Sequence, residues 1–181
     1  MKYLVFLFVF SVSLIAQSKD KSNSVFVGTE APTFSLPDMN QQYFSLGDFC
    51  GKKLRKPWKN KTKHVVVLSF FATWCKPCKE ELPHLMKLRN QFKKEKIKFF
   101  LIDVGEKAEL VKKFLEKYEI DIPVLLDQYQ KTAEKYDALT LPRLFVIDKN
   151  GIIRKEQKGF TNAGQFEDEM QILLSGLIKS D

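Results

Sequence analysis

Two cysteines separated by two residues, in the WCKPC stretch at positions 74–78, constrain this chain more than any other feature. An apolar, β-prone run precedes them at residues 65–71, and residues 79–94 repeat apolar side chains at helical spacing. Cys75 is therefore expected at a strand-to-helix junction, where free N–H groups and the helix dipole favour a thiolate. The pattern predicts a reversible dithiol, with Cys75 as the exposed nucleophile and Cys78 as the buried resolving thiol.

The residues around the cysteines support this chemistry better than metal binding. Lys76 and Lys79 add positive charge near the expected thiolate, and Pro77 suits the first turn of a helix. A structural zinc site built on Cys-x-x-Cys needs more ligands than the chain offers. Its other candidates are a third cysteine and two histidines, namely Cys50, His64 and His84.

The N-terminal region predicts export. Residues 1–18 combine an early lysine, an apolar run from Tyr3 to Ile15 and small residues near Ala16, which is typical of a signal peptide. An uncleaved anchor is the alternative, although the run is shorter than the roughly 20 residues of a spanning helix. Residues 19–30 are small and polar and predict a flexible lead-in, so the domain is expected to cover residues 31–181.

A net charge of +8 comes largely from a basic loop between Lys52 and Lys63, which contains Trp58. The loop is interpreted either as a docking patch for an acidic partner or anionic membrane, or as a solvated loop with a half-buried tryptophan. Nucleic acid is not an expected partner, since no recognition motif accompanies the charge.

Alternating strand and helix patterns predict an α/β fold. We expect a central mixed sheet flanked by helices, with an N-terminal β-hairpin as an extension. The Asn150-Gly151 pair predicts a second hairpin near the end of the chain. The predicted strands are 34–36, 43–46, 65–71, 97–104, 123–127, 143–148 and 151–158, and the predicted helices are 79–94, 107–118, 132–136 and 163–178. The apolar side of the last helix is predicted to carry Phe166, Met170, Ile172, Leu173 and Leu177.

Over residues 31–178 the chain resembles the thioredoxin fold, and within it the exported thiol-disulfide oxidoreductases of the TlpA/ResA type, which are AhpC/TSA-redoxin-like. The matching segments are APTFSL at 31–36, FSLGDF at 44–49, FFATWCKPCK at 70–79 and LPRLFVID at 141–148. The resemblance implies that Pro142 follows a cis peptide bond and faces the cysteine pair. The implied substrate groove consists of Trp74, Lys76, Pro77, Leu141, Pro142 and Arg143.

Two positions depart from the thioredoxin pattern. Ser69 stands where many thioredoxins place a buried aspartate, whereas Glu81 matches a glutamate that TlpA/ResA-type relatives carry three residues after the second cysteine. The resemblance implies that Glu81 assists proton transfer at Cys78; alternatively, Glu80 and Glu81 are solvated carboxylates of the first helical turn. Arg143 replaces a small hydroxyl residue, and it is expected to lower a thiolate pKa, to engage an acidic partner or to point into solvent.

The remaining cysteine, Cys50, has two interpretations. It is either a buried small apolar residue or a third thiol able to form a mixed or intermolecular disulfide.

The sequence therefore predicts an extracytoplasmic thiol-disulfide oxidoreductase that uses the Cys75-Cys78 dithiol and no other cofactor. The family resemblance implies that it reduces disulfides of exported proteins, for example apocytochrome c during cytochrome c maturation, and takes electrons from a membrane reductase of the DsbD/CcdA type. Three alternatives remain open: a disulfide oxidase or isomerase, a thiol peroxidase, and a soft-metal module that binds copper.

Overall fold

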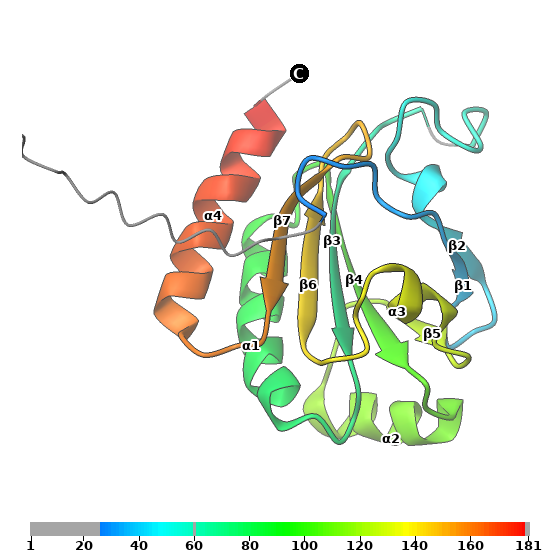
Figure 1. Cartoon of the computed structure of the whole chain (residues 1–181), viewed down its shortest axis with the longest axis vertical. Coiled ribbons are helices and arrows are strands. Elements are labelled where there is room, and N and C mark those ends of the chain that lie inside the picture. The colour runs from blue at the N-terminus through cyan, green and yellow to red at the C-terminus, as the bar shows by residue number, and fades with distance from the viewer. Residues whose placement is uncertain (1–25, 60, 180–181) are drawn as a thin grey trace, which may run out of the picture.

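The computed structural model describes residues 26–59 and 61–179, and their fold is a five-stranded mixed sheet with helices on both faces (Figure 1). The strand order is β5-β4-β3-β6-β7, and a separate hairpin pairs β1 with β2. The predicted α/β architecture is confirmed. The strands are β1(Ser35–Pro37), β2(Tyr43–Ser45), β3(Val65–Phe71), β4(Ile97–Val104), β5(Val124–Asp127), β6(Arg143–Ile147) and β7(Ile153–Lys158), and the helices are α1(Lys76–Gln91), α2(Ala108–Tyr118), α3(Lys131–Lys135) and α4(Ala163–Lys179), with a 3₁₀ turn η1(Leu46–Asp48) after β2.

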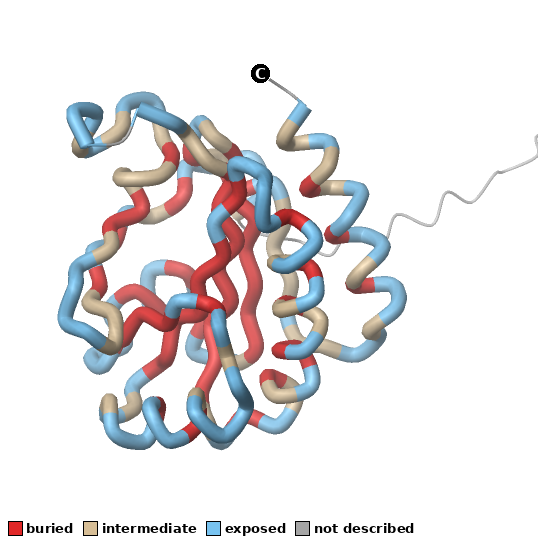
Figure 2. Tube along the Cα trace, turned by 180° about the vertical axis from the view of Figure 1, so that it is seen from behind, coloured by how far each residue is buried: buried red, intermediate tan, exposed pale blue. Residues whose placement is uncertain are grey.

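The central strand β3 is buried along its whole length because both faces of the sheet are covered. Val65, Val67 and Phe71 pack into the core under α1, α2 and α4. Val66, Leu68 and Phe70 face the opposite core, which the hairpin and α3 close. Figure 2 shows the buried positions concentrated along the sheet. A strand between two covered faces reads as a continuous apolar run, as this one does.

Helix α1 begins at Lys76, three residues before the predicted start. Pro77 lies in its first turn, where a missing N–H costs no helical hydrogen bond. The Cys75 sulfur caps the helix by accepting a hydrogen bond from the Cys78 N–H at 3.3 Å. Local sequence therefore starts the helix at the cysteine pair itself.

Helix α4 buries a narrower stripe than predicted. Phe166, Met170 and Leu174 are buried at a spacing of four residues, and Leu173 and Leu177 pack at their edge. The inclusion of Ile172 in the apolar side was wrong, because its side chain is 75% exposed. Ile172 lies two residues from Met170, which turns it away from the buried stripe.

The hairpin and the N-terminal segment cover one end of the second core. An Asp38 carboxylate oxygen accepts the Asn40 and Gln42 N–H groups, both at 2.8 Å, and so closes the predicted hairpin turn. Residues 26–30 belong to the domain and not to a lead-in, because Phe26 packs edge-on against Phe145 and Gly28 donates to the Ile153 carbonyl. The predicted signal peptide at 1–18 and the lead-in up to residue 25 lie outside the described residues.

The basic loop between η1 and β3 is partly neutralised within the molecule. Arg55 forms two hydrogen bonds to the Asp48 carboxylate, and Lys52 pairs with Glu30 at 2.6 Å. The expectation of a half-buried Trp58 was wrong, because 73% of its surface is exposed. In the part of the chain described, no helix has the length and apolar character needed to cross a membrane.

Candidate active site

Cys75 and Cys78 form a disulfide where β3 leads into α1, with their Cα atoms 5.3 Å apart. This is the end of the sheet at which the parallel strands β3 and β4 stop, the lower end in Figure 1. Open α/β sheets place their chemistry at this edge. The predicted contrast between an exposed Cys75 and a buried Cys78 was wrong for this state: both are buried, at 3% and 1%, because the disulfide packs into the core under α1.

Trp74 stands beside the buried disulfide and is 70% exposed. Lys76 is also exposed, and Pro77 is half-buried. An exposed aromatic ring next to a buried sulfur pair offers a contact surface for an incoming polypeptide. The Cys78 N–H in the first turn of α1 donates to the Cys75 sulfur at 3.3 Å, so the start of the helix stabilises negative charge on that sulfur after reduction.

The Leu141–Pro142 peptide bond is cis, as the family resemblance implied. β6 runs antiparallel to β3 with Arg143 opposite Phe70, so continuing the register sets Pro142 beside Phe71. Pro142 is buried and Leu141 is half-buried against the core that contains both cysteines. The fold thus brings Leu141 and Pro142, far along the chain, to the strand end that carries the disulfide.

Glu81 lies one helical turn after Cys78 on the same buried face of α1. The Ser69 hydroxyl donates to Glu81 Oε2 at 2.8 Å, and Oε1 of Glu81 is buried without a hydrogen-bond partner. Burial raises the pKa of Glu81 to about 7, and the Ser69 hydrogen bond opposes that rise. Of the two carboxylates considered from the sequence, only Glu80 is solvated; Glu81 is 1% exposed.

Arg143 is buried, which corrects the prediction that it points into solvent or engages an outside partner. Its guanidinium contacts Asp137 Oδ2 at 2.8 Å and Glu156 Oε1 at 2.7 Å, and its side chain is 4% exposed. It is aligned with Phe70, whose ring belongs to the core opposite α1. Arg143 therefore ties the loop before Pro142 to β7, on the sheet face away from the cysteine helix.

Comparison with known proteins agrees with this geometry. Residues 27–156 match the AhpC/TSA family. The chain belongs to the AhpC/TSA family. It is 31% identical to the thiol-disulfide oxidoreductase ResA of Bacillus subtilis (strain 168) over 153 residues, which are 84% of this chain and 79% of that protein. ResA of Geobacillus kaustophilus is 31% identical over 152 residues, covering 84% of this chain and 80% of the relative.

The fold relationship extends to solved structures. A crystal structure assigned as the thiol:disulfide interchange protein DsbE of Chlorobium tepidum superposes with a TM-score of 0.68 and 28% identity. The match covers 81% of this chain and 95% of that one. The thioredoxin-like fold, the Cys75–Cys78 disulfide and these relatives identify this AhpC/TSA-family chain as a thiol-disulfide oxidoreductase.

Sequence reasoning missed three polar residues next to the site of this AhpC/TSA-family chain. Glu106 accepts a hydrogen bond from the Thr73 hydroxyl at 2.7 Å and another from the Thr73 N–H. Asp103, behind Glu106, is completely buried near the end of β4. The sequence did contain a sign of Asp103, because an aspartate within an apolar strand is rarely buried unless it has a specific role. Nothing local in the sequence pairs Glu106 with Thr73.

The two histidines are boundary residues, as predicted. His84 Nδ1 lies 2.6 Å from Glu167 Oε1, and its ring stacks on Phe160. His64 is half-buried beside the ring of Phe49. Within residues 26–59 and 61–179, no group of three or more histidine, cysteine or acidic side chains is arranged to hold a metal ion.

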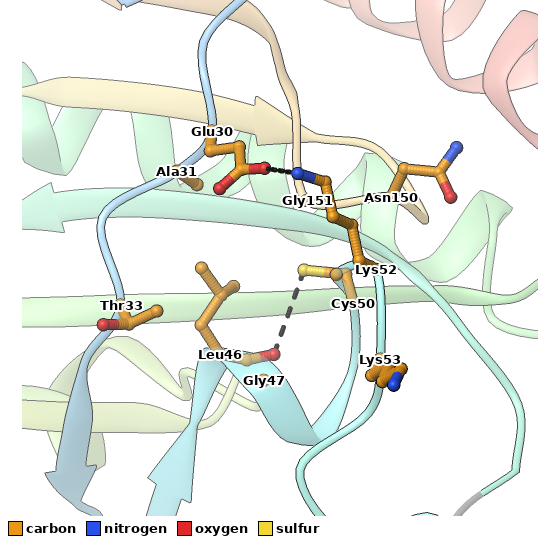
Figure 3. A pocket seen from close by; sticks show the side chains of 11 residues that line it. Glu30, Ala31, Thr33, Leu46, Gly47, Cys50, Lys52, Lys53, Asn150 and Gly151 are labelled. Carbon is orange, nitrogen blue, oxygen red and sulfur yellow. Dashed lines mark hydrogen bonds and ion pairs between the residues drawn. The ribbon is translucent and has the colours of Figure 1, made fainter.

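Cys50 is a buried free thiol, in agreement with the apolar interpretation, and it lies in the core opposite Cys75 and Cys78. Figure 3 shows its sulfur directed at the Leu46 carbonyl, near the Lys52–Glu30 ion pair. Cys50 lines a pocket of about 250 Å³. Burial raises the pKa of Cys50 to about 12, so it remains a thiol at neutral pH. Its position on the other sheet face also excludes it as a shared ligand with the cysteine pair.

Proposed function

We propose that this oxidoreductase works outside the cytoplasm and reduces disulfides of exported proteins. The observation that carries the proposal is the Cys75–Cys78 disulfide at the start of α1, with a buried carboxyl, Glu81, one turn behind Cys78. The helix start favours the Cys75 thiolate, and the carboxyl with a pKa of about 7 exchanges protons at neutral pH. A nucleophile and an acid–base group are both needed for two successive sulfur exchanges.

In the first exchange, the Cys75 thiolate attacks one sulfur of the partner's disulfide. That S–S bond breaks, a mixed disulfide forms, and the other partner sulfur leaves as a thiolate and takes up a proton. In the second exchange, Cys78 loses its proton to the Glu81 carboxylate and attacks the Cys75 sulfur. The partner's second sulfur leaves and is protonated, so two electrons have passed to the partner and the Cys75–Cys78 disulfide is restored.

The surface around the disulfide suits a polypeptide substrate. Trp74 is 70% exposed next to Cys75, and Leu141 lies half-buried before the cis bond to Pro142. Exposed apolar side chains gathered at one edge are typical of a contact surface for another chain. The groove proposed from the sequence, comprising Trp74, Lys76, Pro77, Leu141 and Pro142, is where the partner's disulfide segment lies in this proposal.

The proposed location and partners rest on the N-terminal sequence and on the relatives. The apolar run from Tyr3 to Ile15 fits a signal peptide or an anchor. The Bacillus subtilis and Geobacillus kaustophilus relatives are named ResA, and the Chlorobium tepidum relative is assigned as DsbE. We propose apocytochrome c as one substrate. We also propose a membrane reductase of the DsbD/CcdA type as the electron donor, because a protein that reduces disulfides in an oxidising compartment must itself be reduced again.

The reduction potential of the Cys75–Cys78 pair tests the direction of electron flow. Equilibration with glutathione or dithiothreitol buffers is expected to give a value near that of thioredoxin, about −270 mV. A value near −120 mV, like that of DsbA, would reverse the proposal and make the chain an oxidase or isomerase. Rapid consumption of hydrogen peroxide, or tight copper binding lost in Cys75→Ser, would instead support the peroxidase or metal-binding alternatives.

A further inference from the structure

The turn that leads into Cys75 is held by one carboxylate from another part of the chain. Thr73 lies two residues before Cys75, and both of its hydrogen-bond donors point at Glu106. The hydroxyl reaches Glu106 Oε1 at 2.7 Å, and the backbone N–H reaches Oε2. A carboxylate that accepts two donors from one residue restrains both the position and the rotation of that residue.

The chain is bent sharply to bring Glu106 to this place. Gly105 follows β4 with φ of 82°, in the left-handed region that only glycine adopts without strain. Its N–H donates to the Asp127 carbonyl at 3.1 Å, and a Cβ at this position would lie 2.3 Å from the Gln130 side chain. The bend therefore depends on glycine and turns Glu106 back toward Thr73.

Asp103 supports Glu106 from the interior. The Glu106 N–H donates to Asp103 Oδ1 at 3.2 Å, and the Asp103 side chain is completely buried. Burial, the adjacent Glu106 carboxylate and the nearby Asp127 raise the pKa of Asp103 well above its usual range. The raised pKa favours the neutral form of Asp103, and the Glu106 carboxylate accepts the two Thr73 donors.

We propose that Glu106 is a positioning residue of the dithiol site, which fixes the turn before Cys75 and places a negative charge next to it. This inference rests on the proposed function, since it assigns a device that keeps the pair reducing. Thr73 and Cys75 are two Cα steps of about 3.8 Å apart, which together lie within the Debye length of about 8 Å, so in this proposal the charge bound at Thr73 acts on the Cys75 thiol. An anion at that range disfavours the Cys75 thiolate and therefore favours transfer of electrons to a partner's disulfide.

Three substitutions separate charge from position. Glu106→Gln removes the charge and keeps an oxygen acceptor for Thr73. Glu106→Asp keeps the charge and withdraws the oxygens by one methylene. Glu109→Gln is the matched control, because Glu109 is an exposed carboxylate three residues further along the chain. Each protein is equilibrated with reduced and oxidised glutathione, and the Cys75 thiolate of the reduced protein is titrated by its absorbance at 240 nm.

Glu106→Gln is expected to shift the glutathione equilibrium toward the dithiol by about three- to tenfold and to lower the pKa of the Cys75 thiol, as expected for one charge near a partly buried group. Glu106→Asp is expected to change the equilibrium less than twofold and to slow attack on oxidised glutathione. Glu109→Gln is expected to match the wild type in both measurements. Thermal unfolding checks that each variant is folded.

The inference is overturned if folded Glu106→Gln and Glu109→Gln give the same equilibrium and the same Cys75 pKa. If Glu106→Gln does not fold, Glu106→Asp decides alone: a wild-type rate of attack contradicts the positioning role. The ratio of the glutathione equilibrium constants of variant and wild type tests this inference, whereas the absolute reduction potential of the wild type tests the proposed function. The two can therefore fail independently.

Discussion

The Ser69 hydroxyl donates to Glu81 Oε2 at 2.8 Å, and the two side chains are each 1% exposed. Ser69 comes from β3 and Glu81 from α1, so the contact joins the strand that leads to the cysteine pair with the helix that follows it. The hydroxyl supplies one hydrogen bond to a carboxyl that burial otherwise drives toward its neutral form. Burial therefore raises the pKa of Glu81 to about 7, and the Ser69 hydrogen bond opposes any further rise.

Glu81→Gln is expected to remove the step near pH 7 from the pH dependence of disulfide reduction. The wild-type carboxyl has a pKa of about 7 because it is buried, and glutamine cannot accept the Cys78 proton. We expect the rate above pH 7 to fall by about 10²-fold, the lower range for loss of a general base. Insulin reduction or single-turnover fluorescence of Trp74 measures it.

Glu80→Gln is the control for that experiment, because Glu80 is the neighbouring but exposed carboxylate. It is expected to retain the wild-type profile. If Glu81→Gln also retained it, Glu81 would have no part in proton transfer.

Ser69→Ala is expected to move the same titration to higher pH. The Ser69 hydrogen bond favours the charged form of Glu81, and its loss raises the pKa of that carboxyl further. A pKa that is higher by about one corresponds to roughly 1.4 kcal/mol, close to the low end of the about 1.5 to 3 kcal/mol of a hydrogen bond to a charged group. Ser69→Thr keeps a hydroxyl and should return the titration midpoint most of the way to the wild-type value. An unchanged midpoint in Ser69→Ala contradicts the assignment.

The oxidised protein is expected to lose stability as pH rises through neutrality. The pKa of Glu81 is raised from 4.5 to about 7 on folding, so the folded state holds this proton more tightly than the unfolded chain does. Its contribution is complete below pH 4.5 and is lost as pH rises through 7.

The free energy of unfolding, measured by urea titration, should therefore fall by about 2 to 3 kcal/mol between acid and mildly alkaline pH on account of Glu81. Glu81→Gln should show a correspondingly shallower fall. The remaining slope combines Asp103, whose raised pKa acts in the same direction, with His64, whose pKa is lowered by burial and acts in the opposite direction. Equal slopes in wild type and variant would show that the folded state does not hold the Glu81 proton.

Arg143→Met is expected to destabilise the protein by about 3 kcal/mol. Arg143 is buried and pairs with Glu156, whose side chain is 1% exposed, so removal of the guanidinium breaks a buried ion pair and leaves Lys158 Nζ, at 3.8 Å, as the more distant cation of that carboxylate. Arg154→Met is the matched control, since Arg154 pairs with Asp148 but is 46% exposed and should cost less than about 1 kcal/mol. Similar losses in both variants would contradict the buried-ion-pair argument.

Cys50 is expected to be inert. Burial raises the pKa of its thiol to about 12, and 2% of the residue is exposed, so iodoacetamide should not modify the folded, oxidised protein within the time that labels a urea-unfolded sample. Cys50→Ala should leave the reduction potential of the Cys75–Cys78 pair unchanged. A dimer on nonreducing electrophoresis that disappears in Cys50→Ala would show instead that this thiol forms intermolecular bridges.

Most of the secondary structure could be predicted because it depends on neighbouring residues. The run at 97–104 is β4 with the predicted bounds, and Asn150-Gly151 joins β6 to β7. The predictions were wrong where the burial of a residue did not follow from its apolar or polar character. Ile172 and Trp58 are exposed because no other element covers them, and residues 26–30 join the domain because Phe26 finds an apolar partner on β6.

The sequence by itself determined the cysteine pair, its place between a strand and a helix, and the α/β alternation around it, since hydrophobic period, proline position and cysteine spacing are local properties. Only the tertiary structure decided which polar side chains meet. Ser69 with Glu81, Thr73 with Glu106, and Arg143 with Glu156 are separated by 12, 33 and 13 positions. Burial makes each pairing matter, because a carboxyl removed from water takes its protonation state from the few groups that touch it, and packing alone selects those groups.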